Sequence, residues 1–356
     1  MTADAIINSA ANGTEKITVN RPDFLGRMNL LRGVVLLFLV LVIAACRPQE
    51  AVVQPTALPT LSPTPRSTPL PVVATAVPPG QESNPLQIVL RPFESLNTAR
   101  AVLDDLEDAI LNQSGITVNF ELVNRDAEAL AALCASSSGR TAAVWVGGVE
   151  YLAAEAMNCG QPVLQVERGT RANASTGSAS SVIVRAGSSL AQLSALNDRI
   201  FCRLSYDDVS TWLIPVLMLQ ASGVNITDDL QQIRDYDSIP ELVKAVASRQ
   251  CDAAGIPSDA LEQFDDDLGD TVEQVNVIAT SLEFPYAVML LPAEVPLGTR
   301  VALNDAFIRL ARDQRVSSQL RSLLGQSAII AAVPSDFDEL VEFGESTGLD
   351  FAQLGN

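Results

Sequence analysis

The stretch RIFCRLSYDDVSTWLIPVLMLQASG, residues 199–223, contains the local pattern on which the fold prediction rests. The apolar run 199–204 predicts a strand, the polar residues 205–211 predict a turn, and the apolar run after them predicts a helix. Pro215 is tolerated only near a helix start, so the helix should begin close to Ser210. Unpaired N–H groups at such a start suit an anionic or polar ligand, and a plain capped helix is the alternative.

The same alternation of strands and helices continues through most of the chain. Strand patterns occupy 86–93, 116–123, 141–148, 161–167, 180–185, 199–204, 230–236, 251–257, 275–280 and 284–292. Helix patterns occupy 98–113, 126–135, 149–157, 190–196, 211–222, 238–248, 258–264, 299–312 and 315–324, before an acidic tail. This order predicts an α/β fold in which mostly parallel sheets are flanked by helices.

We expect two lobes joined by two crossovers, with a cleft between them. Lobe 1 is discontinuous and comprises 86–178 plus 281–356, and lobe 2 comprises 179–280. Open sheets of this class bind ligands beyond the carboxyl ends of their strands, which points to the loops at 91–95 and 147–150.

Composition excludes several classes of function. The 356 residues include no His, so Ser-His-Asp triads and His-based zinc sites are excluded. We find no paired carboxylates at catalytic spacing, no phosphate-loop motif and no metal-ligand cluster, and we expect neither an enzyme nor a cofactor. The net charge of −19 lies entirely after Leu86 and predicts a solvated surface that does not bind nucleic acid.

The N-terminal region carries an export pattern. Residues 1–45 are predicted to form a signal peptide whose apolar run, GVVLLFLVLVIAAC, is too short to span a bilayer comfortably. Ile43-Ala44-Ala45-Cys46 resembles a bacterial lipobox, so Cys46 is expected to carry the lipid, a palmitate, at the outer face of the cytoplasmic membrane. A signal followed by an ordinary cysteine is the alternative. The long polar segment before Met28 suggests that translation starts there.

Residues 46–85 form a spacer in this interpretation. The segment contains half of the chain's 20 prolines, mixed with Thr, Ser, Ala and Val, and cannot bury a core. After a lipidated cysteine it would hold the folded part away from the membrane. A ligand motif for a proline-binding partner is the alternative.

Four further cysteines lie in the part expected to fold. In an exported protein an even set suggests two disulfides, for which three pairings exist. Pairing Cys134 with Cys159 and Cys202 with Cys251 keeps each bridge inside one predicted lobe. Buried free thiols are the alternative.

From about Leu86 to Leu324 the chain resembles the type II periplasmic binding proteins of ABC transporters, most closely the phosphate-, phosphite- and phosphonate-binding PhnD-like family. The segments that carry the resemblance are SSVIVRAGSSLAQLSAL, SYDDVSTWLIPVLML, CDAAGIPSDAL and FPYAVMLLP, in this order. The family's ligand loop reads Ser-Thr-Ser-Gly before an apolar triplet and Pro. Aligned on Pro215, this chain has Asp208, Val209, Ser210 and Thr211, so only one serine is kept.

Asp208 places a carboxylate where the family donates hydrogen bonds to an anion, which costs several kcal/mol by repulsion in a semi-buried cleft. An oxyanion is therefore one expectation, and an amine-bearing or neutral solute is the other. The predicted ligand-binding residues are Phe93, Gly147, Gly148, Tyr206, Asp208, Ser210, Thr211, Ser258 and Tyr286. A tight turn is the alternative for the two glycines, and core packing is favoured for Trp212.

The function predicted from these features is that of a lipid-anchored solute-binding protein. It would capture a small molecule between the lobes and present it to an ABC permease in the membrane, with no chemistry of its own. The alternative is a surface-tethered sensor or interaction protein that keeps the fold without transport.

Overall fold

The computed structural model describes residues 77–355 except 138, 139 and 171, and these fall within one compact unit. The predicted signal peptide, Cys46, the Met28 start and most of the spacer lie outside the described residues. Within the described residues, no helix is both long and apolar enough to cross a membrane.

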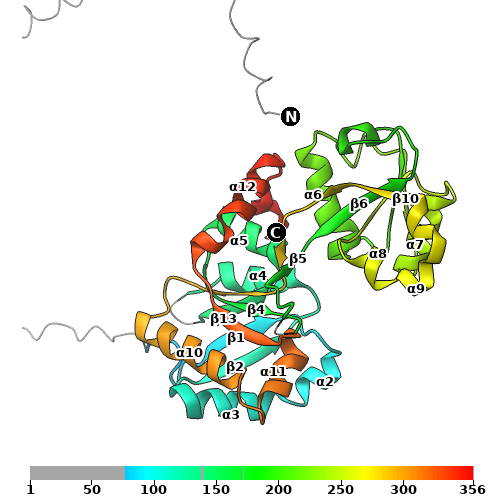
Figure 1. Ribbon diagram of the computed structural model, residues 1–356. Helices are drawn as coiled ribbons and strands as arrows, with labels where there is room; N and C mark the ends of the chain where they lie inside the picture. Colours follow the sequence, from blue (N-terminus) through cyan, green and yellow to red (C-terminus); the bar gives the residue numbers. More distant parts are fainter. Residues whose placement is uncertain (1–76, 138–139, 171, 356) are drawn as a thin grey trace, which may run out of the picture. The chain divides into compact units, whose positions relative to one another are not determined.

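The first sheet has six strands in the order β13-β4-β12-β3-β1-β2. Figure 1 labels β13, β4, β1 and β2 of this sheet. Their bounds are β1 Leu86–Leu90, β2 Val118–Leu122, β3 Ala142–Val146, β4 Gln161–Glu167, β12 Val288–Leu291 and β13 Ala328–Ala331. β1 pairs in parallel with β2 and β3, β12 pairs antiparallel with β3 and β4, and β13 pairs antiparallel with β4. β1, β2, β3 and β4 therefore run in one direction and end at the same edge.

Helices cover both faces of this sheet, which explains why its central strand β3 is a continuous apolar run. The helices are α2 Leu96–Arg100, α3 Leu103–Ser114, α4 Asp126–Cys134, α5 Gly148–Met157, α10 Leu297–Leu310, α11 Ser317–Leu324 and α12 Asp338–Ser346. On one face α4 and α5 pack against Val144 and Val146, and on the other α3, α10 and α11 pack against Ile88 and Trp145.

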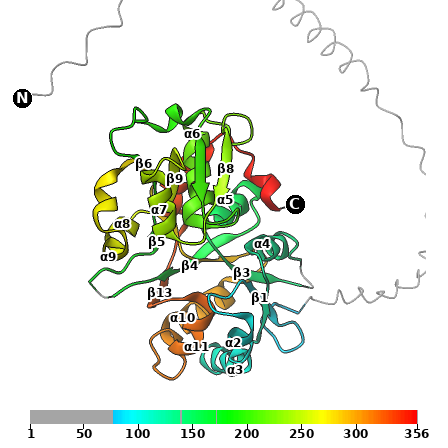
Figure 2. The ribbon, with the colours of Figure 1, turned by 90° about the vertical axis from the view of Figure 1, so that its right-hand side faces the viewer.

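The second sheet has five strands in the order β10-β6-β9-β7-β8. Their bounds are β6 Ser180–Arg185, β7 Ile200–Arg203, β8 Gln232–Asp235, β9 Ala253–Pro257 and β10 Val275–Thr280. Only β6 runs against the others, because it is antiparallel to both β9 and β10. Figure 2 shows α6 Ile214–Ala221 and α7 Ile239–Ala247 beside these strands, and their buried residues pack on opposite faces.

Two crossovers join the sheets, and they pair with each other. β5, Gly177–Ser178, lies between β4 and β6, and β11, Phe284–Pro285, lies between β10 and β12. The two short strands are antiparallel, with Phe284 opposite Ser178. The predicted α/β fold of two helix-flanked, mostly parallel sheets joined by two crossovers is confirmed. The exact lobe boundaries stay a prediction.

Several element predictions are wrong in detail. The predicted helix 98–113 is divided into α2 and α3, and the predicted helix 190–196 is only the 3-10 turn η1, Leu193–Leu196. The predicted helix 258–264 is the short α8, Ala260–Gln263, followed by α9, Asp265–Leu268. The tail contributes β13 and α12, which we did not predict. The remaining 3-10 segments are η3 Gly269–Gln274, η4 Pro334–Phe337 and η5 Phe351–Gly355.

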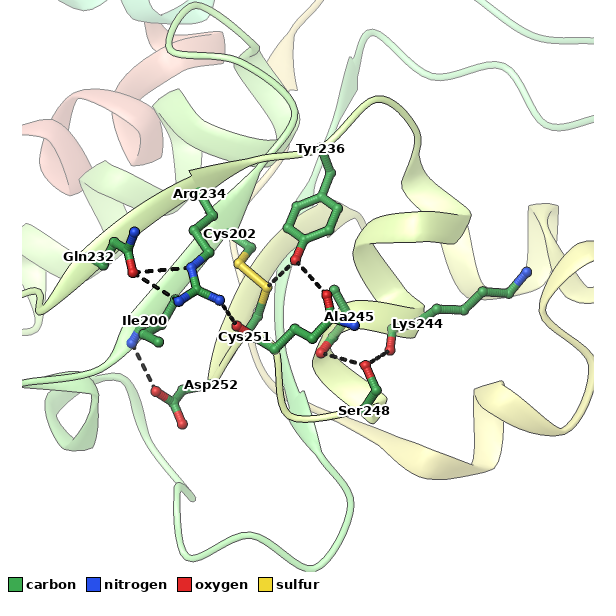
Figure 3. Close-up of a disulfide and its surroundings, with 11 residues drawn as sticks. Ile200, Cys202, Gln232, Arg234, Tyr236, Lys244, Ala245, Ser248, Cys251 and Asp252 are labelled. Carbon is green, nitrogen blue, oxygen red and sulfur yellow. Dashed lines mark hydrogen bonds between the residues drawn. A yellow bond between two sulfur atoms is a disulfide. The ribbon is translucent and has the colours of Figure 1, made fainter.

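Both predicted disulfides are present. Cys134 at the end of α4 is bonded to Cys159, and Cys202 in β7 is bonded to Cys251 just before β9. The second bridge is surrounded by hydrogen bonds (Figure 3): the Ile200 N–H donates to Asp252 Oδ2 at 2.9 Å. The bridge and this bond hold β7 against the chain that enters β9.

Candidate functional site

A cavity of about 500 Å³ lies at the carboxyl ends of the parallel strands of the first sheet. Arg91 follows β1, Asp126 begins α4 after β2, Gly147 follows β3 and Arg168 follows β4, and all four line the cavity. This is the edge at which sheets of this class bind ligands. Further lining residues are Pro92, Phe93, Trp145, Val146, Gly148, Val149, Glu150, Ser178, Val209, Ser210, Phe284, Pro285, Tyr286, Ala287, Leu323 and Leu324.

Arg168 is the most unusual side chain in this cavity. Its guanidinium carbon lies 4.8 Å from the centre of the Phe93 ring and 4.5 Å from the centre of the Tyr286 ring. Its Nη2 donates to the Leu324 carbonyl at 3.0 Å, whereas its Nε is buried and has no acceptor among the described residues. Burial lowers the pKa of Arg168, and no ion pair compensates the charge within the described part of the chain. A partly desolvated cation without a carboxylate is a place for an anion.

A second charged group lies on the same cavity wall. Arg91 forms an ion pair with Asp126, with Nη2 and Oδ2 separated by 3.2 Å. Burial, followed by repulsion from Asp126, raises the pKa of Glu150 to about 7, while Arg91 opposes the shift. Burial also raises the pKa of Asp126, against the attraction of Arg91. Asp126 is thus already paired, whereas Glu150 changes its charge near neutral pH.

The two predicted glycines lie at the start of α5 and have different neighbours. A Cβ at Gly148 would approach Pro285 Cδ to 2.8 Å, so the returning crossover leaves no room for a side chain there. A Cβ at Gly147 would instead lie 3.3 Å from Glu150 Oε2. Glu150 therefore occupies the helix start that we expected to face a ligand.

The turn between β7 and α6 satisfies its own polar groups. Asp208 Oδ1 accepts from the N–H and from the hydroxyl of Thr211, each at 2.7 Å. The Thr211 hydroxyl oxygen in turn accepts from the Leu204 N–H at 3.1 Å. The Leu213 N–H reaches the Asp208 carbonyl at 2.9 Å, a π-helical bond, so the helix begins as η2, Val209–Leu213. The predicted helix start close to Ser210 is therefore confirmed.

The other predicted residues divide between the cavity and its surroundings. Phe93, Gly147, Gly148, Ser210 and Tyr286 line the cavity. The following do not line it: Tyr206, Asp208, Thr211 and Ser258.

Each residue outside the cavity has a clear local environment. Tyr206 is 69% exposed, whereas Thr211 is buried. The Ser258 N–H donates to the Ala179 carbonyl at 3.0 Å. Trp212 is buried and packs against Phe201, and Arg203 stacks on its ring at 4.3 Å, which agrees with the favoured core role. The ligand roles of all nine residues stay predictions.

Sequence reasoning pointed to the loops 91–95 and 147–150 but did not name Arg91, Asp126 or Arg168 as lining residues. Arg91 and Arg168 each stand directly after a strand, in LQIVLR and QPVLQVER, and this position was a usable signal. The pairing of Arg91 with Asp126 had no sequence signal, because it depends on the alignment of β1 beside β2. Among the described residues, no group of three or more acidic or cysteine side chains is arranged to hold a metal ion.

Comparison with known proteins identifies the fold and the family. Residues 88–337 match the family model described as ABC transporter, phosphonate, periplasmic substrate-binding protein. No curated protein matches this chain. Among solved structures, XAC2383 from Xanthomonas citri bound to ATP is similar with a TM-score of 0.55 and 14% identity, covering 74% of this chain and 97% of that chain.

Two further structures are similar. The same Xanthomonas citri protein bound to chloride ion has a TM-score of 0.54 and 15% identity, over 74% of this chain and 97% of that one. PhnD1 from Prochlorococcus marinus in complex with methylphosphonate has a TM-score of 0.48 and 15% identity, over 74% and 98%. Because the family model matches more than half of the residues, the chain belongs to the family of periplasmic substrate-binding proteins of phosphonate ABC transporters.

Proposed function

We propose that this protein captures a small solute in the cavity at the end of the first sheet and delivers it to an ABC permease. The observation that carries this proposal is Arg168, a cation on the cavity wall without a carboxylate partner in the described residues. An uncompensated charge in a partly dry site is costly, and a bound ligand can remove that cost. Membership of the substrate-binding family supports the same role.

Several lining residues support capture by two parts of the molecule. Arg168, Phe93 and Tyr286 belong to the first sheet and its crossovers, whereas Ser210 belongs to the turn before α6. A ligand that contacts both parts would favour the arrangement in which both contacts are made. In this proposal binding involves no bond cleavage.

The second part of the proposal concerns the membrane. Cys46 would carry the lipid after removal of residues 1–45, and residues 46–85 would tether the protein to the outer face of the cytoplasmic membrane. The support is the lipobox-like Ile43-Ala44-Ala45-Cys46 and the proline-rich composition. Mass spectrometry of the protein from membranes tests this directly. We expect an acylated N-terminal cysteine, and C46S should release the protein from the membrane fraction.

A thermal-shift screen tests solute capture. The full-length chain, purified in detergent, is heated with phosphonates, sulfonates, carboxylates and amines. A ligand present at about 100 times its Kd should stabilise the folded state by about 2.7 kcal/mol, which is a clear rise in melting temperature. If no small solute raises the melting temperature, the capture of a solute is refuted.

A further inference from the structure

We propose that the preferred ligand is an organic monocarboxylate, held in the plane of the Arg168 guanidinium, and not a phosphonate dianion. This inference rests on the proposed function, because it names the class of solute that the same cavity would take. It depends on the rings around Arg168, on the two helix starts nearest to the cavity and on the charges of the wall.

The rings of Phe93 and Tyr286 restrict how an anion can approach Arg168. They cover the guanidinium at centroid distances of 4.8 and 4.5 Å. The N–H bonds of a guanidinium lie in its plane, so an acceptor binds there and not over the stacked rings. A carboxylate is planar and matches two parallel N–H donors in this geometry. A phosphonate can also pair with two donors of this fork, but its third oxygen lies outside the plane, and its second negative charge needs a further partner.

The donors that remain at Arg168 suit a carboxylate. Nη2 already donates to the Leu324 carbonyl at 3.0 Å, and Nε has no acceptor among the described residues. The indole Nε1 of Trp145, another lining residue, is also buried without an acceptor in the described part of the chain. Two buried donors without acceptors are rare in folded proteins, since each costs about 1–3 kcal/mol. A ligand oxygen in the plane of Arg168 would supply the acceptor that its Nε lacks.

The helix starts that would stabilise a more highly charged oxyanion are occupied by side chains of this protein. At α5 Glu150 lines the cavity, and its Oε2 would lie 3.3 Å from a Cβ at Gly147, the residue before the helix. At η2 Asp208 accepts from the N–H and hydroxyl of Thr211, each at 2.7 Å. A dianion placed against either start would meet a carboxylate in a site of low dielectric constant. Arg168 is therefore left as the principal anchor, with one positive charge.

The remaining wall is suited to an apolar ligand body. Val146, Val149, Phe284 and Leu323 line the cavity together with the two rings. The second cation of the cavity, Arg91, is already paired with Asp126 at 3.2 Å. Within the described part of the chain, the wall thus offers one free positive charge and an apolar surface, which is the complement of a monocarboxylate with a hydrocarbon body.

Calorimetry with matched ligand pairs tests this proposal on the full-length chain in detergent. The pairs are benzoate with phenylphosphonate and hexanoate with pentylphosphonate, measured above neutral pH. The variants are R168Q, R168K and, as control, R309Q, which removes an exposed arginine of α10. We expect each carboxylate to bind at least tenfold more tightly than its phosphonate. R168Q should lose at least tenfold for carboxylates, R168K should lose an intermediate amount, and R309Q should bind normally.

The outcomes separate this inference from the proposed function. If phosphonates bind as tightly as their carboxylate partners, solute capture stands and the carboxylate preference is refuted. If R168Q binds carboxylates like R309Q, the role of Arg168 is refuted. If R168Q lowers the melting temperature strongly, the role of Arg168 is judged from R168K instead. Lysine keeps the positive charge but lacks the two parallel N–H donors of the guanidinium. If these ligands and all solutes of the thermal-shift screen fail to bind, both proposals are refuted.

Discussion

Two strand ends of this protein carry polar side chains, and these side chains make different contacts. After β7, Asp208 accepts from Thr211 and Thr211 accepts from Leu204, so these polar groups of the turn are hydrogen-bonded to one another. After β4, Arg168 reaches the cavity with an Nε that has no acceptor among the described residues. A polar turn of the expected pattern is therefore no evidence of a binding site until its hydrogen bonds are counted.

The difference has a physical origin. A turn between a strand and a helix must satisfy the free N–H groups of the helix start, and a nearby Asp or Thr does this locally. An Arg after a strand is not needed to cap a helix, and its long side chain can place the charge on the wall of the cavity. We therefore expect changes at the β7 turn to affect stability, and changes at Arg168 to affect binding.

The largest expected effect on stability comes from Gly255 in β9, which lies beneath the turn. A Cβ at Gly255 would lie 2.5 Å from both Pro215 Cγ and the Thr211 carbonyl oxygen. We expect G255A to lower the free energy of unfolding by about 3 kcal/mol, because backbone atoms would have to move. Urea unfolding measures this value.

The control for Gly255 is G298A, since a Cβ at Gly298 in α10 meets no described atom within 4 Å. It should not destabilise the protein. Under conditions in which G255A remains folded, adding R168Q should weaken carboxylate binding by the same factor as in the unsubstituted protein. Equal stability of the two variants would contradict the tight packing under the turn.

A smaller effect is expected on the cavity side, at Glu150. Its pKa is raised to about 7 in the folded state from 4.5, so the folded state binds the proton more tightly than the unfolded state. The corresponding stabilisation is present in full below about pH 4.5 and is lost as the pH rises through about 7. We expect E150Q to remove most of this loss, because glutamine does not titrate.

Unfolding by urea at several pH values measures the Glu150 contribution. The control is D266A, because Asp266 is exposed in α9. The stability of D266A should fall between pH 4.5 and 7 as in the unsubstituted protein, and that of E150Q should fall less. A parallel pH profile for E150Q would show that another group causes the fall.

The sequence predicted the fold well because the central strands of the first sheet are buried on both faces, so β3 is a continuous apolar run and β1 is one apart from Gln87. The acidic tail hid β13 and α12, since the burial pattern there is weak and the strand has only four residues. The cavity was predicted only in part. Glycines and aromatic residues next to strands can be found by position, whereas the stacking of Phe93 and Tyr286 on Arg168 joins distant parts of the chain.

The smallest effect is expected at Asp208 itself, and it tests the turn most directly. D208A removes the acceptor of the Thr211 N–H and hydroxyl and should cost about 1 kcal/mol of stability. D208S should restore most of this loss, because serine also accepts from the N–H groups of a helix start. Neither variant should change carboxylate affinity more than about twofold, which is below about 0.5 kcal/mol. A tenfold change in affinity with unchanged stability would mean that the turn contacts the ligand, so that residues after both β4 and β7 bind it.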